Sequence, residues 1–223
     1  TGTPAILVLV DGFTRYGGSQ YLNSAATGRY EDYIIDEVIP FVDAHYRTIP
    51  APEARGVFGK SSGGYGAMIL GMRHPDVFRA VACHSGDMAF DLCYAPDFPK
   101  AANAFNAAGG VVEWWTTFAA KIKPGKDDHD PLNILAMAAC YSPDAAEPLG
   151  IALPFDLATC ERRSDVWARW LEWDPVAQVD RYAENLRQLA LLFLDCGTRD
   201  EFNLHYGARQ MARRLAERGI AHE

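Results

Sequence analysis

The sequence predicts an α/β fold in which a mostly parallel sheet carries helices on both faces. Two observations support this fold class. Short apolar runs that resemble buried strands, such as residues 5–10 (AILVLV), alternate with longer segments in which apolar residues recur at helical spacing. The intervals between them are too long for hairpins and suit strand–helix–strand units, which place successive strands parallel in one sheet.

The first elements follow this rhythm. Residues 5–10 predict a strand buried on both faces, and the glycine-rich stretch 11–28 predicts a long loop. From Tyr30 to Tyr46, apolar residues repeat at helical spacing, with Pro40 as a point of bending. A short strand over 55–58 then meets Gly59, and a helix rich in small residues follows.

Later elements continue the pattern after an interruption. Residues 78–83 and 190–194 predict two more strands, and residues 201–218 predict a long amphipathic helix. Between Asp87 and Asp180 the alternation is lost, and this stretch holds all five tryptophans. We interpret residues 1–223 as a single domain and residues 88–180 as an insertion over the carboxyl edge of the sheet.

Composition and charge restrict the class of partner. The chain has 223 residues and a formal net charge of −8, which argues against a nucleic-acid or anionic membrane surface as its main partner. We expect a small-molecule partner and leave homo-oligomers open. The five scattered cysteines form no CxxC pair and are interpreted as reduced, which favours a cytoplasmic protein with secretion as the alternative.

Neither end of the sequence resembles a domain edge. The chain enters a strand-like run within a few residues of Thr1, and residues 219–223 predict the beginning of a further strand. We therefore expect the sequence to be a portion of a longer chain, truncated at both ends.

One motif suggests chemistry. Gly59-Lys60-Ser61-Ser62-Gly63 fits the pattern G-x-S-x-G, and it stands between a predicted strand and a predicted helix. That context is required for a nucleophile elbow, a turn so tight that the serine backbone is strained and its hydroxyl projects from the sheet edge. A phosphate-binding loop is excluded because the full pattern Gly-x-x-x-x-Gly-Lys-Ser/Thr is absent. Ser62 is a weaker candidate because Lys60 would then occupy a position that needs a small residue.

Three segments resemble one known family: residues 59–67 (GKSSGGYGA), 73–78 (RHPDVF) and 82–87 (ACHSGD). They are similar to the Putative esterase family of α/β-hydrolases, which includes esterase D, enterochelin esterase, feruloyl and acetylxylan esterases and the mycolyltransferases. The similarity covers residues 5–88 and 188–223. It implies an α/β-hydrolase fold and a serine esterase that needs neither a cofactor nor a metal.

The remaining site residues follow from the fold and the resemblance. One oxyanion donor is expected to be the N–H after the nucleophile, in Ser62. The resemblance assigns the second to Phe13, after Asp11-Gly12, although Gly12 could equally be a glycine that ends a strand. It selects Asp200 as the catalytic acid, because family members place theirs in a Gly-Thr-x-Asp segment; Asp195 is the alternative, and Asp200 could also cap the following helix.

No histidine is assigned as the base. The resemblance places it in a Gly-Gly-His segment beyond Glu223, and His84 breaks the expected order Ser, Asp, His along the chain. The leading hypothesis is ester hydrolysis through an acyl-serine intermediate. The alternatives are acyl transfer of the mycolyltransferase type and a non-catalytic binding protein that keeps the fold. The tryptophans of the insertion either line a substrate pocket or form the insertion's own core.

Overall fold

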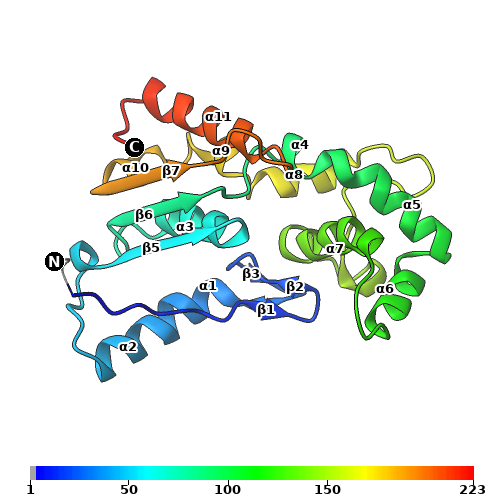
Figure 1. The fold of residues 1–223 in the computed structure, drawn as a ribbon, viewed down its shortest axis with the longest axis horizontal. Coiled ribbons are helices and arrows are strands. Elements are labelled where there is room, and N and C mark those ends of the chain that lie inside the picture. Colours follow the sequence, from blue (N-terminus) through cyan, green and yellow to red (C-terminus); the bar gives the residue numbers. More distant parts are fainter. Residues whose placement is uncertain (1–3) are drawn as a thin grey trace.

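The centre of the structure is a parallel three-stranded sheet (Figure 1). This computed structural model describes residues 4–223. The sheet has the order β5-β6-β7, with strands Gly56–Lys60, Ala80–His84 and Leu191–Asp195. In register, Lys60, His84 and Asp195 lie side by side at the carboxyl ends of the strands. The three later strands predicted from the sequence are therefore confirmed within about two residues, as is their parallel arrangement.

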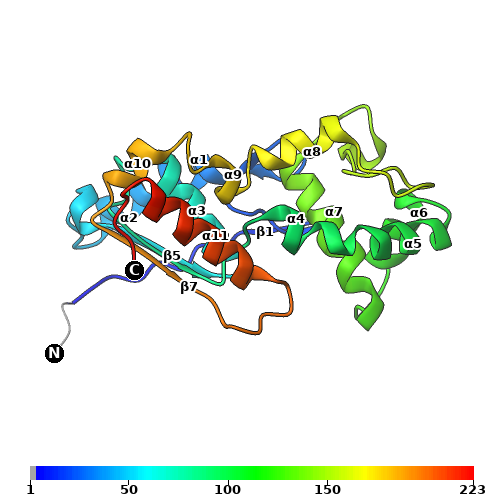
Figure 2. The same cartoon turned by 90° about the horizontal axis from the view of Figure 1, so that it is seen from above.

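The two faces of this sheet differ. Helix α3 (Ser62–Arg73) packs against β5 and β6, and Figure 2 shows α3, α10 and α11 on one side of the strands. Val81 and Leu192 point to that side and are buried. On the other face, Phe58 is 61% exposed in the described structure. The α/β-hydrolase fold class predicted from the sequence is confirmed.

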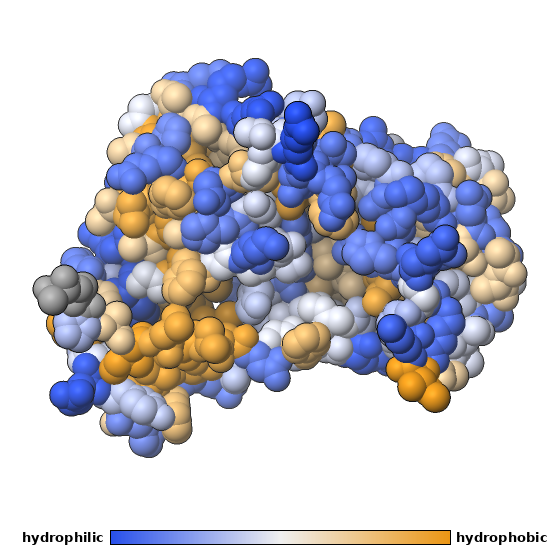
Figure 3. All heavy atoms as spheres, in the orientation of Figure 1, coloured by the Kyte–Doolittle hydropathy of each residue, from blue (hydrophilic) through white to orange (hydrophobic). Residues whose placement is uncertain are grey.

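The predicted strand over residues 5–10 is wrong. The segment forms no strand, and Leu7 and Leu9 are 64% and 86% exposed. It runs alongside β5 in Figure 1, and Figure 3 shows a broad hydrophobic area in that part of the surface. A continuous apolar run indicates burial on both faces, which requires covering elements above and below. Of this segment only Val10 packs into a hydrophobic cluster, with Ile34 and Leu70.

Two small hairpins organise the stretch predicted as a long loop. Strand β1 (Phe13–Thr14) pairs with β2 (Gly17–Gly18), and β3 (Asn23–Ser24) pairs with β4 (Gly28–Arg29). The helical pattern that follows is confirmed as one run of three pieces, α1 (Tyr30–Asp32), the π-helix η1 (Tyr33–Val38) and α2 (Ile39–His45). Pro40 lies in the first turn of α2, where a missing N–H is tolerated.

Residues 88–180 add no strand to the central sheet. They fold into helices beyond the carboxyl ends of the strands (Figure 1), with Trp170 fully buried among Phe90, Tyr141 and Trp167. The helices and short 3₁₀ turns of the chain not yet given are η2 (Pro52–Ala54), α4 (Phe90–Cys93), η3 (Ala95–Asp97), α5 (Phe98–Ala108), α6 (Val111–Ala119), η4 (Lys126–Asp128), α7 (His129–Tyr141), η5 (Pro148–Gly150), α8 (Ser164–Leu171), α9 (Pro175–Gln178), α10 (Ala183–Arg187) and α11 (Leu204–Glu217).

The long amphipathic helix predicted near the end of the chain corresponds to α11, which begins three residues later than expected. Beyond it, Glu223 lies against β7: its N–H donates to the Leu192 carbonyl at 2.9 Å, and its own carbonyl accepts from the Leu194 N–H at 2.8 Å. This pairing is consistent with the strand expected from residue 219. No helix in residues 4–223 has the length and apolarity to cross a bilayer.

An ionic contact fastens α1 to the end of α3. Glu31 is buried, and its Oε1 accepts hydrogen bonds from Arg73 Nε and His74 Nε2, both at 2.7 Å. Burial on its own would raise the pKa of Glu31, but the bonds from His74 and Arg73 outweigh burial and hold the pKa below its ordinary value. The contact therefore contributes its full stability at pH values above the ordinary glutamate pKa. This contribution is lost as the pH falls through the lowered pKa of Glu31 in the folded protein.

Replacing Glu31 by glutamine is expected to lower the free energy of unfolding by about 1–3 kcal/mol at pH 7, because the buried ion pair with Arg73 is lost. The difference in free energy of unfolding between wild type and Glu31→Gln should shrink as the pH falls toward 4 and below. Urea denaturation at several pH values measures both effects. Glu53→Gln is the matched control, since Glu53 is exposed and lies 3.5 Å from Arg79; surface pairs contribute at most about 1 kcal/mol. Equal losses in the two variants would contradict the prediction.

Candidate active site

Ser61 occupies the turn between β5 and α3. Its backbone has φ 56° and ψ −125°, a combination that costs energy for any residue other than glycine. Two hydrogen bonds hold it there: the Ser61 N–H donates to the His84 carbonyl at 3.0 Å, and the Ser61 carbonyl accepts from the Tyr65 N–H at 2.9 Å. The residue is exposed. The turn thus presents a serine hydroxyl at the carboxyl edge of the sheet, as a nucleophile elbow requires.

The glycines around Ser61 allow this close approach. A Cβ on Gly59 would lie 2.4 Å from the carbonyl carbon and oxygen of Gly63. A Cβ on Gly64 would lie 2.8 Å from the His84 carbonyl oxygen, whereas a Cβ on Gly63 would meet nothing within 4 Å. Gly59 and Gly64 are therefore the positions where a side chain would clash. The motif alone suggested that Gly59 and Gly63 are the positions that need a small residue.

Ser62 differs from Ser61 in conformation. It is the first residue of α3, so its N–H is one of the donors that a helix start leaves without an intrahelical partner. The helix N-terminus also carries a partial positive charge. This arrangement fits the role expected for Ser62, a backbone N–H donor beside the nucleophile.

Phe13, the second expected oxyanion donor, lies in a loop that packs on α3. A Cβ on Gly12 would lie 2.9 Å from the Tyr21 ring, and a Cβ on Gly66 of α3 would lie 2.4 Å from the same ring. The Phe13 N–H is engaged, because it donates to Asp11 Oδ1 at 2.9 Å. Its role as an oxyanion donor stays a prediction, and it requires that the bond to Asp11 be exchanged for one to substrate.

The two candidate acids have different surroundings. Asp200 Oδ1 accepts from the N–H groups of Phe202 at 3.0 Å and Leu204 at 3.1 Å, at the start of α11. It therefore also satisfies the helix end, as expected from the sequence. Asp195 Oδ1 instead lies 2.9 Å from His84 Nδ1 on the neighbouring strand. The two backbone bonds at the helix start fix the position of the Asp200 carboxyl group.

The histidines of the described chain are engaged elsewhere or lie apart from Asp200. His45, His74, His129 and His222 bond respectively to Phe41, Glu31, Asp130 and Ile220, and His84 bonds to Asp195. Nδ1 of His205 is buried without a hydrogen-bond partner. Within residues 4–223 none of them bonds to Asp200, and no group of three potential metal ligands is found.

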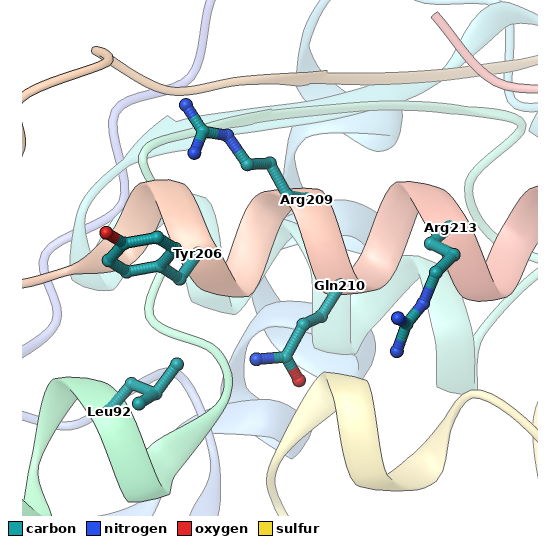
Figure 4. Close-up of a pocket in the computed structure, with 5 residues that line it drawn as sticks. All are labelled: Leu92, Tyr206, Arg209, Gln210 and Arg213. Carbon is teal, nitrogen blue, oxygen red and sulfur yellow. The ribbon is translucent and has the colours of Figure 1, made fainter.

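A surface groove lies along α11 (Figure 4). Its volume is about 420 Å³, and it is lined by Leu92, Tyr206, Arg209, Gln210 and Arg213. None of these lining residues belongs to the Ser61 turn. Among the tryptophans of the insertion, Trp114, Trp167 and Trp170 are buried, which favours the insertion's own core over a pocket for these three.

Sequence reasoning missed one group beside the elbow. Asp87 follows β6, is buried, and interacts with Asp200 and with the Ser62 hydroxyl. Its buried partner Gln20 comes from the loop after Phe13. The signal available was Gly86-Asp87 directly after a predicted strand, at the sheet edge where the other site residues were expected.

Comparison with known proteins supports the family assignment. Over 86 residues the chain is 31% identical to "Esterase Rv1288" and to "Esterase MT1326" of two Mycobacterium tuberculosis strains, H37Rv and CDC 1551. This match spans 38% of the chain but only 19% of those relatives. Among solved structures, the Staphylococcus aureus serine hydrolase FphF has a TM-score of 0.52 at 16% identity, over 92% of this chain and 58% of that one.

A ferulic acid esterase is also similar, with a TM-score of 0.48 and 20% identity over 91% of this chain and 54% of that one. At such identities the structural likeness concerns the fold. The sequence model of the family described as "Putative esterase" matches residues 9–222, nearly the whole chain. The chain therefore belongs to the Putative esterase family.

Proposed function

We propose that the protein hydrolyses a carboxylic ester through a covalent acyl-serine intermediate at Ser61. The observation that carries the proposal is the strained backbone of Ser61 at the strand-to-helix turn, with the start of α3 directly behind it. Strain of this kind persists only where surrounding structure enforces it, and it is concentrated at functional sites. The serine hydroxyl is exposed at the sheet edge, where an ester can reach it.

The reaction proceeds in two balanced steps. The Ser61 oxygen attacks the ester carbonyl carbon while a base takes the hydroxyl proton, and the carbon–oxygen bond to the alcohol breaks as the alcohol leaves with that proton. Water then attacks the acyl carbon while the base takes a proton from it; the bond from this carbon to the Ser61 oxygen breaks, that oxygen takes the proton back from the base, and the acid is released. The Ser62 N–H and, once freed from Asp11, the Phe13 N–H stabilise the negative oxygen of each tetrahedral intermediate.

Asp200 is the proposed orienting acid. Its Oδ1 accepts from two backbone N–H groups at the start of α11, so its position is set before any base binds to it. The base is a histidine that donates a ring N–H to Asp200 and takes the proton from Ser61. None of the histidines in residues 4–223 makes such a bond, so the proposal assigns this role to no described residue.

Trapping of the intermediate tests the proposal. The full protein is mixed with p-nitrophenyl acetate and quenched within seconds, and its peptides are analysed by mass spectrometry. We expect one acetyl group on the peptide that contains Ser61 and an early burst of p-nitrophenol. Added alcohol acceptors that raise product release and yield new esters would indicate acyl transfer instead of hydrolysis. Absence of both acetylation and fluorophosphonate labelling would favour a non-catalytic binding protein and overturn the proposal.

A further inference from the structure

Asp87 is the centre of a buried polar cluster next to the elbow. Its Oδ2 accepts hydrogen bonds from Gln20 Nε2 at 3.0 Å and from the Tyr94 hydroxyl at 2.8 Å. Gln20 Nε2 also lies 3.0 Å from the Tyr141 hydroxyl, at the end of α7. Gln20 and Tyr141 are 0% and 2% exposed. The cluster thus joins the loop that carries Phe13, the turn after β6 and the helices of residues 88–180.

The same cluster touches the nucleophile turn. A Cβ on Gly86 would lie 2.9 Å from the Gly64 carbonyl carbon, so the backbone beside Asp87 packs directly on the first turn of α3. The Ser62 hydroxyl also interacts with the Asp87 carboxyl. Asp87 therefore links Gln20, in the segment after Phe13, to the first turn of α3.

No cation balances a charge on Asp87. None of the ion pairs found in residues 4–223 includes it. Burial raises the pKa of Asp87, and the negative charge of Asp200 acts in the same direction; the hydrogen bonds from Tyr94 and Gln20 do not offset this. An isolated buried carboxylate is costly, and such a group takes up a proton instead.

A second observation points to that proton independently. Gln20 Oε1 is buried and has no hydrogen-bond donor among the described residues. Turning the amide over brings this oxygen to the place of Nε2, 3.0 Å from Asp87 Oδ2 and 3.0 Å from the Tyr141 hydroxyl, which can donate to it. Two acceptors at that distance also require a proton between them.

We infer that Asp87 is held as a neutral carboxylic acid paired with the Gln20 amide, and that this pair fixes the Phe13 loop against the nucleophile elbow. Asp87 is a positioning residue, which acts through Ser62 and Gln20 rather than on substrate. The neutral form also avoids placing a second negative charge beside Asp200. The positioning role depends on the proposed function of Ser61, whereas the charge state does not.

Asp87→Asn in the full protein tests the charge state, because asparagine keeps a neutral acceptor and donor. Infrared spectra at pH 7 should show a protonated-carboxyl stretch that the variant lacks and that Asp174→Asn, which alters another buried aspartate, retains. In the unfolded chain Asp87 ionises above a pKa of about 3.9, whereas in the folded protein its pKa is higher. Between these two pKa values the folding equilibrium constant of wild type, divided by that of Asp87→Asn, should therefore fall by up to about tenfold per pH unit. An Asp87 that is ionised at pH 7 predicts no such band and a relative stability that no longer changes with pH near 7, and either result would overturn the inference.

The positioning role is tested by the rate at which a fluorophosphonate labels Ser61. Asp87→Leu, which leaves Gln20 and Tyr94 unpaired, should slow labelling at least about tenfold, and Asp87→Asn should restore it. If Asp87→Leu does not fold, Gln20→Met takes its place. Labelling in the leucine or methionine variant at the wild-type rate would refute the positioning role. Absence of labelling in wild type would instead count against the proposed function, while the infrared and stability results would still decide the charge state.

Discussion

Replacing Ser61 by alanine is expected to abolish both fluorophosphonate labelling and ester turnover in the full protein. The hydroxyl is the proposed attacking group, and removal of a catalytic serine typically lowers turnover on the order of a million-fold. The fold should remain, because Ser61 is exposed and alanine fits the same strained backbone no worse than serine does. Labelling rates and a thermal melt, measured on the same preparation, separate loss of chemistry from loss of structure.

Ser62→Ala is the matched control for this experiment. It removes the neighbouring hydroxyl but keeps the backbone N–H that serves as the proposed oxyanion donor. We expect labelling to persist, with at most a modest slowing from the lost contact with Asp87. Full labelling of the Ser61→Ala protein, combined with its loss in Ser62→Ala, would move the nucleophile by one residue and refute the elbow assignment.

The strand-to-helix turn at Ser61 could be predicted from the sequence because its requirements are local. A short apolar strand, small residues and a helix follow one another within 20 positions, and each places Ser61 by backbone geometry alone. The parallel pairing of the strands also followed, since the intervening helices leave little choice of topology. Phe13 and Asp200 came from the family resemblance, and their contacts at Asp11 and the α11 start became visible only in the structure.

Sequence reasoning failed where the outcome depends on distant neighbours. Residues 5–10 have the composition of a buried strand, but composition does not say whether a covering element is present, and here the segment is exposed. The Asp87 cluster was invisible for a related reason. Its members Gln20, Asp87, Tyr94 and Tyr141 are separated by up to 121 positions, and no local pattern indicates that they meet.

Gly59→Ala is expected to have the second largest effect on the site. The added Cβ would lie 2.4 Å from Gly63 backbone atoms, which cannot turn away as a flexible side chain could. The turn must open, and a displacement of about 1 Å at a reacting group can cost on the order of 100-fold in rate. We also expect a loss of about 1–3 kcal/mol in the free energy of unfolding, the usual cost of overpacking. Labelling kinetics and urea denaturation measure the two effects.

Gly63→Ala provides the contrast, since it alters the other glycine of the same motif. Its Cβ would meet nothing within 4 Å, its φ is not positive, and it lies in α3, where alanine is favoured over glycine by up to about 1 kcal/mol. The variant should therefore be as stable as wild type or more so, and it should keep its labelling unless the new methyl group obstructs the probe. Equal losses of stability in the two variants would mean that the turn needs a small residue at both glycines of the motif, which would contradict the prediction. A loss of stability in Gly59→Ala together with a gain in Gly63→Ala would show that only Gly59 is needed. The strained backbone at Ser61 is then maintained by the close approach of the Gly59 and Gly63 backbones.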